Sequence, residues 1–263
     1  MSGEHRVALV TGAARGIGAA VVHRLAREGW RVVAVDVCAD HPDLRYPLAT
    51  RAELAEVAEA HPGVVLPRVA DVRDQAAMHA AVRLAVTEFG GLDAAVAGAA
   101  VMAGGAPLWE TTDSDWDALY DVDLRGVLHL VRAAVPALLA RPEPRTGRFV
   151  ALASGAAHRG LFHLAPYCAI KHGVLGLVRG LAADLIGTGV TATAVSPGST
   201  DTVMLARTAA LYGLPSTEQF SEHQIVSRLL APEEVAAAVC WLCRPESGAV
   251  TGTVLHADGG FIG

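Results

Sequence analysis

The sequence predicts an α/β fold, a doubly wound parallel sheet of about seven strands covered by helices on both faces in three α/β/α layers. Short apolar, β-rich runs alternate with longer helical stretches along the whole chain. Several of these runs lack a period-two alternation, as expected for parallel strands that are buried on both faces. A glycine-rich turn joins the first run to the first helical stretch. Together these observations indicate a Rossmann-type domain.

The expected strands and helices follow one another in regular order from the N-terminus. The apolar runs predict strands at residues 7–10, 32–35, 64–69, 94–96, 148–153, 191–195 and 253–256. The helical stretches cover residues 17–28, 52–60, 75–89, 114–139, 165–186 and 232–243. Since no break in composition and no internal repeat divides the chain, we expect a single domain over residues 1–263.

Two inserts interrupt this alternation, at residues 38–50 and 199–227. Each follows the carboxyl end of an expected strand, where open α/β sheets bind ligands. We therefore expect the first insert to lie near a cofactor and the second to form a lid over a substrate. The charged stretch 218–228 is expected to be a solvated helix face. The side chains predicted as walls of a substrate pocket are Trp109, Met204, Leu205, Leu211, Tyr212 and Phe220.

The composition excludes several classes of protein. With 52% hydrophobic and 18% charged residues, the chain can bury a large core and is not mostly disordered. The net charge of −6 argues against a nucleic-acid-binding protein, which needs a basic face. No apolar run is long enough to predict a membrane span, and the polar N-terminus does not resemble a signal peptide. Four unevenly spaced cysteines fit a reducing cytoplasm, and no spacing predicts a metal site.

The turn TGAARGIG at residues 11–18 predicts a nucleotide-binding site. Glycines let the backbone approach a pyrophosphate, which then lies on free N–H groups at the positive end of a helix. Asp36 ends the second expected strand, and a carboxylate there can bond both ribose hydroxyls and repel a 2′-phosphate. This favours NAD, although Arg15 permits NADP. The residues expected at the cofactor on this reasoning are Gly12, Arg15, Gly16, Ile17, Gly18, Asp36 and, near the adenine, Asp71 and Val72.

Lys171 is the only lysine among 21 basic residues, and Tyr167 precedes it by one helical turn. Since Arg replaces Lys wherever only charge is needed, a retained lysine indicates a role for its ammonium. A nearby ammonium favours the phenolate and lowers the pKa of a tyrosine. Ser154, at the end of the fifth strand, can hydrogen-bond a substrate oxygen on which charge develops. The three residues predict proton transfer coupled to hydride transfer.

Over essentially its whole length the sequence resembles the short-chain dehydrogenase/reductase family. The resemblance is carried by the turn at residues 11–18, by Asp36, by the Ser154–Tyr167–Lys171 set, and by SPGSTDT at residues 196–202 and DGG at 258–260. It implies that Lys171 also binds the nicotinamide ribose and that the proline-glycine turn positions the nicotinamide. The cofactor-binding residues that it adds are Ala97, Gly98, Ala99, Tyr167, Lys171, Pro197, Gly198, Thr200 and Thr202. Family members are usually homotetramers or dimers, so we expect a homotetramer.

The sequence departs from the family pattern in two places. The usual NNAG turn after the fourth strand is replaced by AGAA at residues 97–100, which keeps small residues but loses the side-chain amides. The usual catalytic Asn of the long central helix corresponds to Asp123. An ionised Asp accepts hydrogen bonds but donates none. We include Asp123 in the catalytic set, with the hypothesis that it relays protons through a water linked to Lys171.

The insert at residues 38–50 resembles that of the mycofactocin-associated subgroup of the family. The resemblance implies a nicotinamide cofactor that is held tightly and is re-oxidised by the redox carrier mycofactocin. A loop over the adenosine end slows release by adding contacts that must break first. The alternative is a surface elaboration without a role in cofactor exchange, since loops tolerate insertions.

Taken together, the sequence predicts an NAD-dependent oxidoreductase that acts on a CH–OH group, interconverting a secondary alcohol and a ketone. The apolar lid favours a hydrophobic alcohol, such as a terpenoid or steroid-like compound. One alternative is a freely exchanging NAD(P)-dependent reductase. A second is a nicotinamide-binding sensor with little catalysis, for which the loss of the Asn and of the NNAG turn argues weakly.

Overall fold

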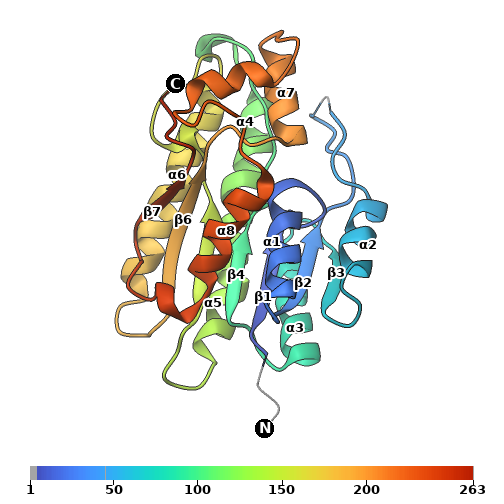
Figure 1. The fold of residues 1–263 in the computed structure, drawn as a ribbon, viewed down its shortest axis with the longest axis vertical. Helices are drawn as coiled ribbons and strands as arrows, with labels where there is room; N and C mark the ends of the chain where they lie inside the picture. The colour runs from blue at the N-terminus through green and yellow to red at the C-terminus, as the bar shows by residue number, and fades with distance from the viewer. Residues whose placement is uncertain (1–4, 45, 263) are drawn as a thin grey trace.

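The computed structural model describes residues 5–44 and 46–262, so the ends of the predicted domain and Arg45 of the first insert lie outside it. The described residues form a parallel sheet in the order β3-β2-β1-β4-β5-β6-β7 (Figure 1). Its strands are β1 (Val7–Thr11), β2 (Arg31–Asp36), β3 (Val65–Val69), β4 (Ala94–Ala97), β5 (Arg148–Leu152), β6 (Thr191–Pro197) and β7 (Val254–Ala257). The predicted seven-stranded Rossmann-type sheet is confirmed. The strand order reverses between β1 and β4, which opens a crevice at the carboxyl ends of the strands.

Helices cover both faces of the sheet. One face carries α1 (Gly16–Arg27), α2 (Arg51–Glu59) and α8 (Pro232–Cys243). The other carries α3 (Gln75–Phe89), α4 (Asp113–Leu119), α5 (Gly126–Leu139) and α6 (Ala165–Asp184). The remaining helix, α7 (Val203–Leu211), lies beyond the carboxyl ends of the strands, near the top of Figure 1. These three layers match the predicted arrangement.

The core explains why this order of elements is stable. Every residue of β1, β4 and β5 is buried, because each of these strands has helices on both sides. Successive side chains of these strands point to opposite faces of the sheet. The apolar ones therefore belong to two separate clusters, one under each helix layer. Alanines in the strands and helices allow the layers to approach closely, which fits the low aromatic content of 5%.

The predicted helix at residues 114–139 is interrupted in the structure. Between α4 and α5 the chain forms a π-helical turn, Tyr120–Arg125, which places the consecutive residues Val122 and Asp123 both in the interior. Such turns insert an extra residue into a helix and often occur at functional sites. A period of 3.6 residues read from the sequence does not reveal this insertion.

The insert at 199–227 contains α7 followed by a 3₁₀ turn, Glu218–His223. The expected solvated helix over residues 218–228 is present only in part: the helical turn ends at His223, and Phe220 and Gln224 are buried, whereas residues 225–228 are exposed. Gln224 has only 1% of its surface exposed, and its side-chain amide donates to the carbonyl oxygens of Ser199 and Arg228. A buried amide in the middle of a charged stretch therefore fixes the end of the insert to its beginning.

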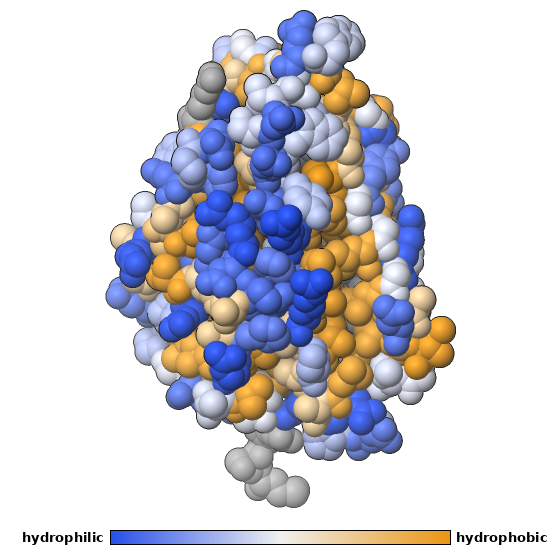
Figure 2. All heavy atoms as spheres, turned by 180° about the vertical axis from the view of Figure 1, so that it is seen from behind, coloured by the Kyte–Doolittle hydropathy of each residue, from blue (hydrophilic) through white to orange (hydrophobic). Residues whose placement is uncertain are grey.

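Within the described residues, no helix is both long and apolar enough to cross a bilayer. Figure 2 shows the molecule from the side of α3, α5 and α6. On this face a hydrophilic area lies beside a broad hydrophobic one.

Candidate active site

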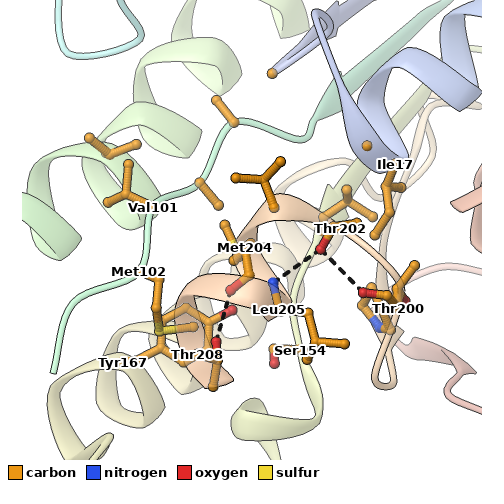
Figure 3. A pocket seen from close by; sticks show the side chains of 18 of the residues that line it. Ile17, Val101, Met102, Ser154, Tyr167, Thr200, Thr202, Met204, Leu205 and Thr208 are labelled. Carbon is orange, nitrogen blue, oxygen red and sulfur yellow. Dashed lines mark hydrogen bonds between the residues drawn. The ribbon is translucent and has the colours of Figure 1, made fainter. Parts of the chain in front are cut away.

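A cavity of about 800 Å³ occupies the crevice at the carboxyl ends of the strands. Its walls come from the turn after β1, the end of β2, the loops after β3 and β4, the start of α6, the loop after β6 and both inserts. Figure 3 shows part of this cavity, with Ser154, Tyr167 and the α7 residues Met204, Leu205 and Thr208 among the side chains that line it. Of the predicted site residues, the following line it: Gly12, Arg15, Gly16, Ile17, Gly18, Asp36, Asp71, Val72, Gly98, Ala99, Ser154, Tyr167, Lys171, Pro197, Gly198, Thr200 and Thr202.

The glycine turn at the start of α1 can be formed only by glycines. Gly12 has φ +68°, and a Cβ on it would lie 2.7 Å from the backbone of Ala99. A Cβ on Gly18 would overlap the carbonyl group of Gly12. Within the described residues, no side chain caps the N-terminus of α1, so its first N–H groups face the cavity without an internal acceptor. This cradle fits a dinucleotide pyrophosphate.

Asp36 lies at the end of β2 with its carboxylate held in place by the backbone. Oδ2 accepts a hydrogen bond from Ala14 N at 3.0 Å, and Oδ1 accepts one from Cys38 N at 3.4 Å. Arg15, the cation that could have bound a 2′-phosphate, donates instead to the carbonyl oxygen of Pro47 in the first insert, at 3.1 Å. The rim of the cavity therefore presents a fixed carboxylate, while its neighbouring guanidinium is already engaged. This arrangement fits a free ribose 2′-hydroxyl.

The predicted adenine contact Asp71 has a partner that the sequence analysis did not identify. The guanidinium of Arg73 donates to its Oδ2 from Nη2 at 2.6 Å and from Nε at 2.9 Å. Burial raises the pKa of Asp71, but the hydrogen bonds and charge of Arg73 outweigh it and lower the pKa below its ordinary value. Asp71 is therefore an ionised, well-oriented acceptor at this end of the cavity.

The loop after β4 packs closely against β1, although it lacks the side-chain amides of the family's usual NNAG turn. A Cβ on Gly98 would lie 2.7 Å from the carbonyl oxygen of Thr11. The Thr11 hydroxyl oxygen accepts hydrogen bonds from Gly98 N and Ala99 N, at 3.1 and 3.3 Å. Ala97 is the last residue of β4 and lies in the core, and it is not among the residues that line the cavity.

Ser154, Tyr167 and Lys171 meet at the far end of the crevice. Ser154 follows β5, while Tyr167 and Lys171 occupy the first two turns of α6. The Lys171 Nζ lies 5.5 Å from the centre of the Tyr167 ring, and the two residues are only 2% and 5% exposed. Ser154 acts to lower the pKa of Tyr167, and its own Oγ accepts a hydrogen bond from Ala156 N at 3.2 Å. The structure thus brings the three predicted residues together.

The electrostatic environment of Tyr167 differs from the prediction. Burial raises the pKa of Tyr167, whereas the Lys171 ammonium and the Ser154 hydroxyl act to lower it. The net direction is upward, because burial outweighs these two contributions and the charge of Asp123 adds to it. The expectation that the ammonium lowers the pKa of this tyrosine below its ordinary value is therefore wrong as a net effect.

Asp123 lies beneath the cavity and forms a buried ion pair with Lys171. Its Oδ2 is 2.9 Å from Lys171 Nζ, and the two side chains are 0% and 2% exposed. Its Oδ1 accepts a hydrogen bond from Val101 N at 2.8 Å. Sequence analysis expected a link through water, but the π-helical turn brings the carboxylate directly to the ammonium.

The loop after β6 closes the end of the crevice where the resemblance predicts the nicotinamide. A Cβ on Gly198 would overlap Gln224 Oε1 and the Asp258 carbonyl oxygen, so only glycine fits there. The Thr202 hydroxyl donates to the Thr200 carbonyl oxygen and accepts from Leu205 N, both at 3.2 Å, which caps α7 (Figure 3). This cap holds the start of α7 against the glycine turn of α1, since the Thr202 methyl group is 3.4 Å from the position of a Cβ on Gly16.

Apolar residues surround the part of the cavity next to Tyr167. The predicted walls Met204, Leu205, Leu211, Tyr212 and Phe220 all line it. Trp109 does not, and this expectation is wrong, since its side chain is 84% exposed and its indole N–H donates to Glu110. The lining residues that sequence analysis did not name include Met102, Leu161, Phe162, Leu164 and Phe261.

The first insert crosses the mouth of the crevice. The Tyr46 hydroxyl oxygen accepts a hydrogen bond from Met102 N at 2.7 Å, on the opposite wall. The guanidinium of Arg207, on α7, lies 5.6 Å from the centre of the Tyr46 ring. With Arg15 bound to Pro47, the insert thus contacts the glycine turn, the loop after β4 and the lid. We call residues 38–44 and 46–50 the strap.

Comparison with known proteins agrees with this geometry. The sequence profile of the family described as "Enoyl-(Acyl carrier protein) reductase" matches residues 12–262. The chain belongs to the short-chain dehydrogenase/reductase family.

Several members of the short-chain dehydrogenase/reductase family are similar over their whole length. An uncharacterized oxidoreductase of Mycobacterium tuberculosis is 36% identical, covering 98% of this chain and 97% of the relative. An uncharacterized NAD-dependent oxidoreductase of the same species is 35% identical, with 98% and 96% covered. The crystal structure of carveol dehydrogenase from Mycobacterium avium in complex with NAD superposes with a TM-score of 0.91 at 32% identity, covering 97% and 96%. The protein is an NAD-dependent oxidoreductase of this family.

Proposed function

We propose that this dehydrogenase/reductase interconverts a secondary alcohol and a ketone, with Tyr167 as the acid/base. The observation that carries the proposal is the position of the Ser154–Tyr167–Lys171 set. It lies where the dinucleotide crevice opens into the apolar part of the same cavity. A substrate oxygen can reach both hydroxyls only if the adjoining carbon faces the nicotinamide end of the crevice.

In this proposal the side chains divide the reaction between them. When bound, the nicotinamide supplies or accepts the hydride. Ser154 donates a hydrogen bond to the substrate oxygen and stabilises the charge that develops there. Tyr167 gives a proton to that oxygen in reduction and removes it in oxidation. Lys171 holds the nicotinamide ribose beside the phenol, and Asp123 acts on the site through its ion pair with Lys171.

The cavity favours a hydrophobic, compact substrate. Its walls beside Tyr167 are mostly apolar side chains, such as Met102, Leu161, Met204 and Leu211, and the same cavity is also lined by His163 and His223. Buried apolar walls discriminate against charged substrates, because the charge loses its hydration without gaining a partner. The similar carveol dehydrogenase is named for a cyclic terpenoid alcohol, and we propose a substrate of that class.

The proposed reaction is tested with purified protein, NAD and a panel of cyclic secondary alcohols, their primary-alcohol isomers and acidic analogues. We expect NADH absorbance at 340 nm with the neutral secondary alcohols and the matching ketone as product. Turnover confined to acidic or phosphorylated analogues would contradict the proposed substrate class. A protein that binds NAD but turns over none of the panel would support the sensor alternative.

We further propose that the strap holds NAD so that it exchanges slowly, and that mycofactocin re-oxidises it. The contacts of Tyr46 with Met102 and of Arg15 with Pro47 support this proposal, since both must break before the mouth of the crevice opens. Denaturing the purified protein and identifying the released nucleotide tests the first part. We expect about one NAD per chain, whereas an empty site with rapid turnover on added NAD would contradict it.

The face formed by α5 and α6 supports a proposed homotetramer. Side chains on the outer side of α5 are apolar but only partly buried in the single chain, as Leu128, Val131 and Val135 illustrate. The hydrophobic area of Figure 2 lies on this side of the molecule. Such an area favours association with a second copy. Light scattering should give four chains per particle, and Val131→Glu should reduce that number; a monomer at micromolar concentration would contradict the proposal.

A further inference from the structure

The Asp123–Lys171 pair places two opposite charges under the catalytic phenol. The 2.9 Å contact is enclosed on every side, because both side chains are essentially inaccessible to solvent. Lys171 Nζ also lies 3.4 Å from the Leu152 carbonyl oxygen, and the other Asp123 oxygen is bound to Val101 N. The pair is therefore fixed by β5, by the loop after β4 and by the π-helical turn, and it cannot separate without moving one of them.

Among the described residues, the charged or titratable groups found to act on Tyr167 come from these surroundings. On α6 they are Lys171, which favours the phenolate, and Cys168, which opposes it. From the start of the 3₁₀ turn after β5, Ser154 favours the phenolate. From the π-helical turn, Asp123 opposes it. On the strap, Tyr46 also faces the Asp123 charge, which raises the pKa of Tyr46, itself about 12 mainly because of burial.

The net charge of the pair does not depend on which partner holds the proton. A carboxylate with an ammonium and a carboxylic acid with an amine both sum to zero. Burial raises the pKa of Asp123, with Lys171 acting against it; burial lowers the pKa of Lys171, but Asp123 and Tyr167 outweigh it, so that the pKa of the ammonium stays above its ordinary value. In either form Tyr167 faces a dipole instead of a full positive charge.

We propose, on the basis of the proposed function, that Asp123 is a positioning residue that cancels the charge of Lys171 and keeps Tyr167 a phenol at neutral pH. The site is then ready at neutral pH to protonate a ketone, and it needs alkaline pH to deprotonate an alcohol. In the reduction, the ketone carbon gains the hydride of NADH, and the carbonyl oxygen takes the proton of Tyr167. The phenolate then recovers a proton from water, while the nicotinamide has been oxidised to NAD.

The amide of an asparagine occupies nearly the same volume as the carboxyl group but carries no charge, so Asp123→Asn tests the proposal. An unbalanced ammonium next to a phenol lowers its pKa by about one unit or more. We expect the acidic limb of the pH profile of kcat/KM for alcohol oxidation to move down by about one pH unit. On that limb, oxidation at pH 7 would become about tenfold faster than in the unaltered protein.

The matched control is Asp121→Asn, in the same π-helical turn. Asp121 is ion-paired with Arg125 at the surface, and its removal changes the net charge by the same amount. We expect the pH profile of this variant to coincide with that of the unaltered protein. An Asp123→Asn profile that is unshifted, or shifted to higher pH, would overturn the proposal, because a purely structural role moves the rate without moving the midpoint.

A second measurement does not depend on catalysis or on the folding of a variant at position 123. The phenolate absorbs near 295 nm, and the difference between the unaltered protein and Tyr167→Phe isolates the titration of Tyr167. We expect no phenolate at this position at pH 7, with ionisation only in the alkaline range. A phenolate present at pH 7 would overturn the proposal. If the protein shows this titration but turns over no alcohol, the proposed function fails and the inference about Asp123 stands.

Discussion

The two ends of the cavity are built in different ways. At the adenosine end the backbone forms the site, because Gly12 and Gly18 leave no room for a side chain and main-chain N–H groups fix Asp36. At the other end, the residues proposed to be catalytic are buried side chains, and Lys171 and Asp123 form an ion pair. The first end should therefore be sensitive to added volume and the second to a change of charge or of a single hydroxyl.

The largest effect should come from removing the one hydroxyl that moves the proton. Tyr167→Phe is expected to lower kcat by about 10³-fold, within the usual range for losing a general acid or base, while NAD affinity stays within about twofold. Steady-state rates and titration with NAD measure the two quantities separately. The control is Tyr120→Phe, outside the cavity, where the ring packs against Arg125. Full activity of the Tyr167→Phe variant would contradict the proposal that catalysis depends on this one hydroxyl.

Adding one methyl group to the glycine turn, at Gly12, should weaken the binding of NAD. Gly12→Ala brings a Cβ against the backbone of Ala99 in a left-handed conformation, which costs about 1–3 kcal/mol. We expect NAD affinity, measured by calorimetry, to fall by about 10- to 100-fold. Gly29→Ala is the matched control, since Gly29 also has a positive φ but has no atom within 4 Å of the added Cβ. Equal NAD affinity in the Gly12→Ala and Gly29→Ala variants would contradict a backbone-built site.

The charge at the adenosine rim should decide between the two dinucleotides. Asp36→Ala removes the carboxylate that repels a 2′-phosphate, and we expect the ratio of kcat/KM for NAD over NADP to fall by about tenfold or more. Arg15→Ala should change this ratio by less than about threefold, because Arg15 is bound to Pro47. Kinetics with both cofactors measure the ratios. A larger effect for the Arg15→Ala variant would show that the guanidinium faces the ribose.

The smallest effect is expected from breaking the hydrogen bond between the strap and the loop after β4. Tyr46→Phe removes the acceptor of the Met102 N–H, and the loss of one hydrogen bond of about 1 kcal/mol should speed NAD release by about fivefold. Release is followed by chasing bound NAD with an excess of a labelled analogue. An unchanged release rate would support the alternative that the strap is a surface elaboration.

The sequence predicted most of what depends on local patterns. The strand–helix alternation and the places of the glycine turn and Asp36 could be predicted from spacing along the chain. The observed strand order and the cavity at the carboxyl ends of the strands agree with that prediction. The register of Tyr167 and Lys171 on one helix face follows in the same way. These features are set by residues that are close in the chain or by rules common to all doubly wound sheets.

Contacts between distant segments could not be predicted in this way. The direct Asp123–Lys171 pair depends on a π-helical turn, and the bond from Met102 to Tyr46 joins segments 56 residues apart. The net direction of the Tyr167 pKa depends on how completely the phenol is buried, which spacing does not reveal. Trp109 was misplaced for the same reason, since packing decides whether a side chain faces the cavity or the solvent.

The most direct test of the account follows hydride and proton transfer in one turnover. Protein with bound NAD is mixed at alkaline pH with a cyclic secondary alcohol that carries either hydrogen or deuterium on the carbinol carbon, and NADH is recorded at 340 nm. We expect a single-turnover burst that is slower with deuterium in the unaltered protein and is absent from Tyr167→Phe. A burst of equal size and rate in the Tyr167→Phe variant would contradict the assignment of Tyr167 as the group that moves the proton.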